Sequence, residues 1–411
     1  MQQDKKDRGI LIFINLAVQI MFVFYTTFFN IFIYSINNDI VFVLLLNAFL
    51  FLVDLLFQLF LTKILTKKNA MIIYRLSFVM IFLSILLAFF VTATTIWLAW
   101  VIMAFYGVAK MCYYVPHEIA VMNKGKNVSM KNFVGLSSIV SSLSAILSPF
   151  LSGFIIGQWS YFAIFGVILA LALIAFVFSI FLKDFYVEPK TNLSLKTVFV
   201  EAHKNKKSKY ALFAFGLEKF SQASVIPVLL PLLLFLKTGG EMSVGLYSSL
   251  VALFATISLA VYVGFVKNKP VAMIIASTLN ISVSIMLILW TNFVSFIIYY
   301  IVRESCHKIF HNGMTATIFT ANKNTVFEEN KREWHMVFST YNQTCSILAS
   351  LITILLYTLW PTEITLTIII LVLSLTQIAS VYFLNKSDGI IMTQTAEKVS
   401  VDEENQCKRV I

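Results

Sequence analysis

The stretch IVFVLLLNAFLFLVDLLFQLFLTKILTKK, residues 40–68, decides the fold class. Residues 40–61 are apolar apart from Asn47, Asp54 and Gln58, and lysines follow directly. An α-helix rises about 1.5 Å per residue, so about 20 apolar residues cross the roughly 30 Å hydrocarbon core of a bilayer. A membrane β-strand instead alternates apolar and polar residues over about 10 positions. The stretch therefore predicts a membrane-spanning helix.

The composition of the whole chain agrees with this interpretation. Hydrophobic residues make up 59% of the 411 residues, and charged residues make up 12%. A soluble domain averages about 45–50% apolar and about 25% charged residues. A soluble fold would expose apolar patches that aggregate, so the excess must face lipid. Because only helices and closed barrels satisfy the backbone in lipid, we predict an all-α membrane protein.

Similar apolar runs recur along the chain between charged or turn residues. We expect about twelve spans, at residues 10–36, 40–61, 71–91, 95–116, 132–157, 160–183, 210–236, 243–266, 270–290, 293–313, 334–358 and 362–385. The longest polar stretch between spans, residues 183–209, divides them into two sets of six. The predicted units are a first six-helix bundle (1–187), a basic linker (188–207), a second six-helix bundle (208–386) and a polar tail (387–411).

A serine pattern supports a relationship between the two sets. The fifth and eleventh spans carry serines at the same spacing and a constant offset: Ser137, Ser144 and Ser148, then Ser339, Ser346 and Ser350. An offset of about half the chain is expected for a duplicated six-helix unit. We therefore predict two pseudo-symmetric bundles. The serine faces themselves are interpreted as seams where helices pack closely.

Cations are distributed unevenly between the predicted loops. One set of loops, for example residues 37–39 and 291–292, is short and nearly free of cations. The other set carries Lys63, Lys67, Lys68, Lys124, Lys126, Lys131, Lys267, Lys269, Lys323, Lys331 and Arg332. The positive-inside rule places this second set, the linker and both termini in the cytoplasm. We therefore expect a multi-pass protein of the plasma membrane.

Several other functional classes are excluded. The net charge of +11 arises in loops, where cations act as orientation signals, so we expect no nucleic-acid partner. The four cysteines show no CxxC spacing, which argues against a metal site or a disulfide framework. The chain has no nucleotide-binding Gly-x-x-x-x-Gly-Lys motif, no nucleophile–base pair and no metal set. We expect neither a cofactor nor an enzyme.

This organisation resembles the major facilitator superfamily over residues 8–386. The shared features are twelve spans, two six-helix halves, a long basic central loop and cytoplasmic termini. Two segments match in part: residues 58–68, with Lys63, Lys67 and Lys68, and the segment Ser148-Pro149-Phe150-Leu151-Ser152-Gly153 at the fifth-helix Gly-Pro signature of exporters. The resemblance implies a transporter that works by alternating access.

The sequence also departs from the superfamily's motifs. The loop after the second helix usually reads Gly-x-x-x-Asp-Arg-x-Gly-Arg-Lys, and its aspartate and both glycines are missing here. The fourth-helix arginine of proton-coupled members would fall near Met103 and is absent. The resemblance therefore names neither a coupling residue nor a substrate.

Polar residues inside apolar spans mark cavities or contacts between helices, because an unsatisfied polar group is costly in lipid. The candidate solute-binding residues lie in the first, fourth, seventh and tenth spans: Asn15, Gln19, Thr26, Asn30, Tyr106, Lys110, Tyr114, Gln222, Tyr300, Arg303 and His307. Interhelical hydrogen bonding is the alternative role. Lys110 and Arg303 favour an anionic or zwitterionic solute.

Four titratable residues are candidates for carrying a coupling proton: Asp54, Glu218, Glu304 and His307. Buried carboxylates and histidines can titrate near neutral pH. Structural ion pairs, Asp54 with Lys110 and Glu304 with Lys308, are the alternative. Pro227 and Pro231 predict a break or kink in the seventh span, a feature found near transporter binding sites.

The leading functional prediction is a secondary active transporter of a small organic solute, coupled to protons. Export is favoured over uptake because of the Ser-Pro-x-x-Ser-Gly segment and the aromatic-rich spans. The alternatives are a lipid or glycolipid flippase on the same fold and a non-transporting membrane sensor or immunity protein. We expect a monomer whose partners are the solute, membrane lipids and protons.

Overall fold

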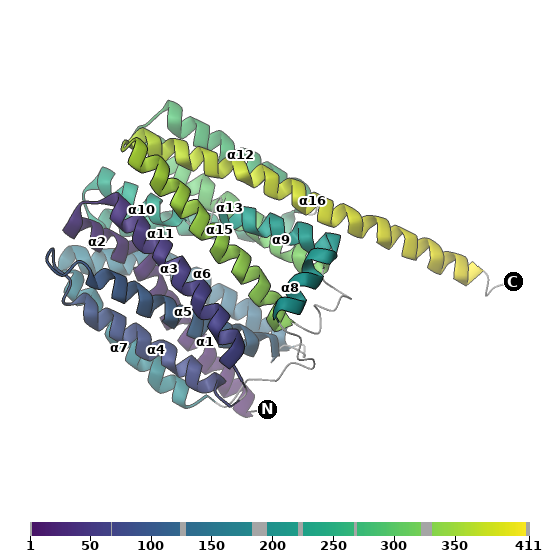
Figure 1. Cartoon of the computed structure of the whole chain (residues 1–411), viewed down its shortest axis with the longest axis horizontal. Coiled ribbons are helices and arrows are strands. Elements are labelled where there is room, and N and C mark those ends of the chain that lie inside the picture. The colour runs from purple at the N-terminus through teal and green to yellow at the C-terminus, as the bar shows by residue number, and fades with distance from the viewer. Residues whose placement is uncertain are drawn as a thin grey trace.

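The computed structural model describes residues 2–66, 68–123, 129–182, 195–220, 225–266, 269–321 and 331–407, with only the backbone described at several helix ends. Within these ranges every element is helical (Figure 1). The elements are α1 (Gln2–Val23), the π-helical segment η1 (Phe24–Phe29), α2 (Asn30–Asn37), α3 (Ile40–Ile64), α4 (Ala70–Ala88), α5 (Leu98–Asn123), α6 (Ser129–Gln158), α7 (Tyr161–Ile180), α8 (Leu195–Lys204), α9 (Lys206–Glu218), α10 (Ile226–Thr238), α11 (Glu241–Phe265), α12 (Lys269–Leu289), α13 (Phe293–Ala321), α15 (Lys331–Leu359) and α16 (Glu363–Cys407).

In the described part of the chain, ten helical segments are long and apolar enough to cross a membrane. They match all the expected spans except the seventh and the tenth. The seventh is divided between α9 and α10, and neither helix is long enough alone. The tenth, α13, carries Arg303, Glu304 and Lys308 in its middle, so its composition is too polar for a simple span. Both exceptions coincide with clusters of candidate site residues.

The first and seventh expected spans both depart from regular α-helix. In the first span η1 separates α1 from α2 without ending the helix. In the seventh span α9 ends in a π-turn at residues 219–220, and Pro227 lies in the first turn of α10. The described residues thus depart from regular α-helix at 219–220 and at 225, as the prolines predicted, and residues 221–224 between them lie outside the described residues. Single π-helical turns of this kind are frequent at functional sites.

The packing of helices is related across the linker. Helices α6 and α11 pack against each other, and so do α15 and α3. In the expected numbering these are contacts of the fifth span with the eighth and of the eleventh with the second. The fifth span corresponds to the eleventh and the eighth to the second, so the two contacts are equivalent under the predicted duplication.

The α6–α11 crossing depends on two glycines. A Cβ atom at Gly153 would lie 2.6 Å from the carbonyl oxygen of Glu241, and one at Gly245 would lie 2.5 Å from that of Pro149. The two backbones therefore touch at positions where any side chain would separate them. The Ser148–Gly153 segment, noted above as an exporter-like feature, is one side of this contact.

The serine faces of α6 and α15 are buried where these helices pack. Ser144 and Ser148 of α6 are buried, as are Ser346 and Ser350 of α15. Ser144 donates a hydrogen bond to a carbonyl oxygen of its own helix, and so does Ser350. The side chain of Ser137 lies outside the described residues.

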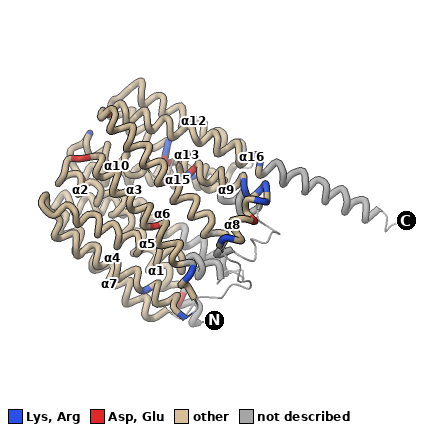
Figure 2. The backbone as a smooth tube through the Cα atoms, in the orientation of Figure 1, with Lys and Arg blue, Asp and Glu red and all other residues tan. Residues whose placement is uncertain are grey.

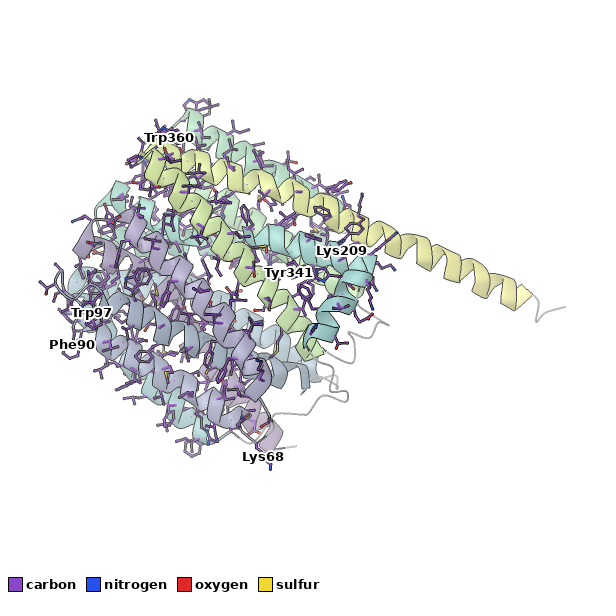
Figure 3. All side chains as sticks on the ribbon, in the orientation of Figure 1. Lys68, Phe90, Trp97, Lys209, Tyr341 and Trp360 are labelled. Atoms are coloured by element: carbon purple, nitrogen blue, oxygen red, sulfur yellow. The ribbon has the colours of Figure 1, made fainter. Side chains whose placement is uncertain are left out.

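The two ends of the helical bundle differ in their side chains. Phe90, Trp97 and Trp360 lie at one end, and Lys68 and Lys209 lie at the other (Figure 3). Charged residues gather mainly at the ends and are few within the bundle (Figure 2). Aromatic and cationic residues of this kind anchor membrane proteins at the two interfaces.

Part of the expected linker is structured. Helix α8 runs across the ends of α9 and α15 instead of alongside them (Figure 1). Val198 and Ala202, one turn apart, are buried in a cluster that includes Trp334 of α15. The side chain of Asn205 caps α9 by accepting hydrogen bonds from the backbone N–H groups of Lys207 and Ser208. The linker therefore contains a helix docked on the bundle.

Candidate functional site

The polar residues of the first span divide into two buried and two accessible side chains. Asn15 donates to Ser141 Oγ at 3.3 Å, and Asn30 Oδ1 accepts from Asn47 Nδ2 at 2.8 Å. Both side chains are buried and join helices together. Gln19 is half-buried, and Thr26, inside η1, is exposed in the middle of the span. Gln19 and Thr26 are therefore the members of this set whose side chains are not fully buried.

The aromatic candidates of α5 also differ in exposure. Tyr106 is buried and stacks on Tyr25 of η1, with ring centroids 3.9 Å apart and an interplanar angle of 13°. Tyr114 is half-buried and lies 5.4 Å from the ring of Phe22. Tyr106 therefore packs against the π-helical segment, while the ring of Tyr114 is only partly buried.

Lys110 of α5 forms an ion pair with Asp54 of α3. Asp54 is fully buried, and the side chain of Lys110 is 18% exposed. A Cβ atom at Gly107, one turn before Lys110, would lie 2.8 Å from Cγ1 of Val53. The missing side chain at Gly107 lets α5 approach α3 closely enough for the pair. The structural alternative from the sequence, a pairing of Asp54 with Lys110, is present.

A second ionisable cluster joins α9 to α13. Glu218, the last residue of α9, is fully buried, and its Oε1 atom lies 3.4 Å from His307 Nδ1 and 3.3 Å from His311 Nδ1. Lys219 Nζ lies 3.7 Å from the other carboxylate oxygen. The carboxylate of Glu218 therefore lies against α13 at the point where the regular α-helix α9 ends. Gln222, also predicted for this site, lies outside the described residues.

His311 lies one turn after His307 on the same helix face, and the structure places it in this cluster as well. The side chain of His311 is 40% exposed, against 19% for His307. The cluster is therefore accessible from the His311 side.

The remaining charges of α13 pair differently from the alternative raised by their spacing. Glu304 forms its ion pair with the adjacent Arg303, and Lys308 donates to Thr256 Oγ1 of α11 at 3.1 Å. The Glu304–Lys308 ion pair that the spacing allowed is therefore wrong, because the Lys308 ammonium group donates to Thr256 on α11 instead. Tyr300, one turn before Glu304, is buried.

A polar contact joins α3 to α15. Gln58 donates to the carbonyl oxygen of Met336 at 2.9 Å and accepts from Ser339 Oγ at 2.5 Å. Gln58 is buried, so both groups of its amide are satisfied across this contact. These two hydrogen bonds hold α3 against α15, which are the second and eleventh expected spans.

These features define a multi-pass helical membrane protein with ionisable groups inside its spans. The fold is shared with solved structures of the nucleoside transporter NupG. One is a mutant, with a TM-score of 0.70 and 13% identity over 93% of this chain and 99% of that chain. The other has a TM-score of 0.66 and 14% identity over 94% of this chain and 99% of that chain. At this identity the likeness shows the fold, which agrees with the transporter-type fold implied by the sequence.

No family model matches the chain, and no curated protein matches it.

Proposed function

We propose that this protein is a secondary active transporter that moves a small polar organic solute by alternating access. The twelve spans form two six-helix bundles, and the protein acts as a monomer in the plasma membrane with both termini in the cytoplasm. The fold shared with NupG supports transport. The exchange-related contacts α6–α11 and α15–α3 support two bundles that rock against each other.

The observation that carries the proposal is the contact of Glu218 with His307 and His311 at the break in the seventh span. Ionisable residues inside membrane spans mark solute or proton pathways. Discontinuous helices in transporters commonly form binding sites, because their free ends expose polar backbone groups. Both features meet at Glu218.

We further propose that this cluster carries the coupling proton. A protonated histidine adds a positive charge facing the Glu218 carboxylate, and loss of the proton removes that attraction. The contact between α9 and α13 is therefore stronger when the cluster holds its proton. Since α9 leads into the break, release of this contact would free α9 to move with the opening of the bundle.

The accessible groups suit a polar solute with a ring. Tyr114 offers an aromatic face, Gln19 offers an amide, and Thr26 offers a hydroxyl. Lys110 and Arg303, which favoured an anionic solute on sequence grounds, each have an internal carboxylate partner. Because the similar fold belongs to a nucleoside transporter, nucleosides are the first compounds to test. We propose export as the direction, in line with the exporter-like segment Ser148–Gly153.

The test is flux in proteoliposomes. Radiolabelled nucleosides, amino acids and organic acids are measured with and without an imposed pH gradient, in both directions. A solute of the expected kind accumulates only when the gradient is present. The variant Glu218→Gln should lose this gradient dependence, and Glu363→Gln, in the exposed pair with Lys237, should retain it. Full gradient-driven flux in Glu218→Gln and in a variant lacking both histidines would show that the cluster is not the proton carrier.

A further inference from the structure

Helix α8 leaves two apolar side chains exposed although it is docked on the bundle. Val198 and Ala202 are buried in the cluster that includes Trp334 of α15. Phe199 and Val200 are 40% and 41% exposed. Successive residues point about 100° apart around an α-helix, so the two pairs face different directions. Phe199 and Val200 therefore face something other than the protein core.

The ring of Phe199 continues an aromatic surface of the membrane-spanning helices. It lies 6.1 Å from the ring of Tyr341 on α15, which lies 6.3 Å from that of Phe213 on α9. Phe213 is 38% exposed and lies 5.8 Å from the ring of Phe383 on α16. Phe213 also lies about 140° around α9 from Glu218, whose carboxylate faces α13. The aromatic surface is therefore on the outside of the bundle.

Lysines accompany this surface. Residues 195–210 contain five lysines and one carboxylate. Four of the lysines are exposed: Lys196, Lys204, Lys206 and Lys209. The carboxylate, that of Glu201, pairs with Lys204 at 3.0 Å. Helix α8 and the start of α9 therefore carry an excess of positive charge at this end of the bundle (Figure 2).

Helix α8 also lies at the height where an apolar span ends. The apolar segment of α16 ends at Ser387, whose hydroxyl donates to the carbonyl oxygen of Lys207 at 3.1 Å. Lys386 Nζ, next to Ser387, lies 4.8 Å from the ring centroid of Tyr382 and 5.8 Å from that of Tyr210. Aromatic and cationic side chains are typical of the membrane–water interface. The start of α9, which directly follows α8, is therefore at the level of lipid headgroups.

We propose that the outer side of α8, formed by Lys196, Phe199, Val200 and Lys204, binds the anionic surface of the bilayer. Phe199 and Val200 insert between the headgroups, and the lysines contact lipid phosphates. Basic amphipathic helices bind membranes through this combination of apolar burial and charge attraction. The partner is a lipid with a net negative headgroup, because a zwitterionic lipid offers no net charge to the lysines.

The proposal requires another side of α8 to face water. Thr197 and Glu201, one turn apart, are polar and lie between the buried pair and Val200 around the helix. The helix thus has a side on the protein, an apolar side toward lipid and a polar side toward water. This is the arrangement expected for a helix that lies in the plane of the interface.

The first test measures the depth of single positions on the full chain in nanodiscs that contain phosphatidylglycerol. The native cysteines are replaced, and a spin label is attached to a cysteine at Val200 or, as the matched control, at Thr197. The label at position 200 should be relaxed by oxygen and shielded from a water-soluble nickel complex. The label at position 197 should show the reverse. Equal access of the nickel complex to both positions would overturn the proposal.

The second test identifies the class of lipid. A bimane fluorophore at position 200 is exposed to brominated phosphatidylglycerol or brominated phosphatidylcholine at equal mole fraction in mixed nanodiscs. The anionic lipid should quench at least about twofold more strongly. Lys196→Gln with Lys204→Gln should bring the two lipids toward equal quenching. Equal quenching before these substitutions would contradict the preference for anionic lipid.

The matched control removes two exposed lysines elsewhere at the same end of the bundle. Lys63→Gln with Lys68→Gln should leave the difference between the lipids intact. An equal loss in both double variants would overturn the assignment to α8. The depth measurement keeps every lysine, so it decides the proposal if a lysine variant does not fold. Neither test measures flux, and both faces of a nanodisc carry the same lipids, so the outcome is independent of the transport function and orientation proposed above.

Discussion

The Oε1 atom of Glu218, the last residue of α9, lies 3.3 Å from Nδ1 of His311 on α13. The same oxygen lies 3.4 Å from Nδ1 of His307, so two imidazoles converge on one carboxylate. Lys219 Nζ approaches the other oxygen at 3.7 Å. Two imidazoles and one ammonium group therefore surround a single buried carboxylate.

This relationship predicts that gradient-driven transport changes when either histidine is replaced. His311→Gln should reduce the gradient-dependent flux, because one of the two imidazoles that face the Glu218 carboxylate is lost. The measurement is initial flux with and without an imposed pH gradient. His203→Gln on α8 is the matched control, since it removes a histidine outside the spans. Unchanged gradient-dependent flux in His311→Gln would show that this imidazole has no part in coupling.

The buried ion pair between Asp54 and Lys110 predicts a strong asymmetry between single and double variants. Lys110→Met leaves the fully buried Asp54 without its cation, which costs about 3–5 kcal/mol of stability if the carboxylate stays charged. Asp54→Asn with Lys110→Met removes both charges and should recover most of that loss. Unfolding midpoints of the three variants measure this difference. Equal losses in the single Lys110 variant and the double variant would mean that the pair contributes nothing beyond packing.

The α6–α11 crossing predicts that Gly245 does not tolerate a larger side chain. Gly245→Val would force the backbone of α11 away from Pro149, and overpacking of this kind costs about 1–3 kcal/mol. Gly264→Val on the same helix is the control, because a Cβ atom at Gly264 would meet nothing within 4 Å. We expect a lower unfolding midpoint for Gly245→Val only. Similar midpoints for the two variants would contradict this close approach.

The Gln58 contact predicts a shift in the opening of the bundle between α3 and α15. Gln58→Leu removes two hydrogen bonds, each worth about 0.5–1.5 kcal/mol, without a large change in volume. The state in which α3 and α15 touch should become less populated. Labelling of a cysteine introduced at Thr340, next to this contact, measures the change, and the same cysteine in the protein with the native Gln58 is the reference. Slower labelling in the Gln58→Leu background would be the opposite of the expected result.

The loop charges predict the orientation of the chain. Cysteines introduced at Asn38, Lys237 and Glu363 should react with a membrane-impermeant reagent in intact cells. A cysteine at Lys204 of α8 should react only after the membrane is opened. The native cysteines are replaced first, because at least three of them are free thiols. Labelling of position 204 from outside would invert the proposed topology.

The class of protein and the position of ten spans could be predicted from the sequence. An apolar run such as residues 40–61 specifies a helix in lipid by its own length and composition, without help from distant residues. The same local reasoning located the break before Pro227, because proline lacks the N–H group that a continuous helix requires. It also placed Arg303, Glu304 and His307 of α13 among the candidate site residues.

The pairing of the internal charges was decided only by the tertiary structure. On α13 the spacing of Glu304 and Lys308 allows an ion pair, but Arg303 takes the carboxylate and Lys308 is directed to Thr256 on α11. Glu218 and His311 are far apart in the sequence, and they meet because the break in the seventh span ends α9 opposite α13. Helical periodicity specifies which residues share a face of one helix. It does not specify which neighbouring helix covers that face or at what height, and those two quantities determine which opposite charges come within a few ångströms of each other.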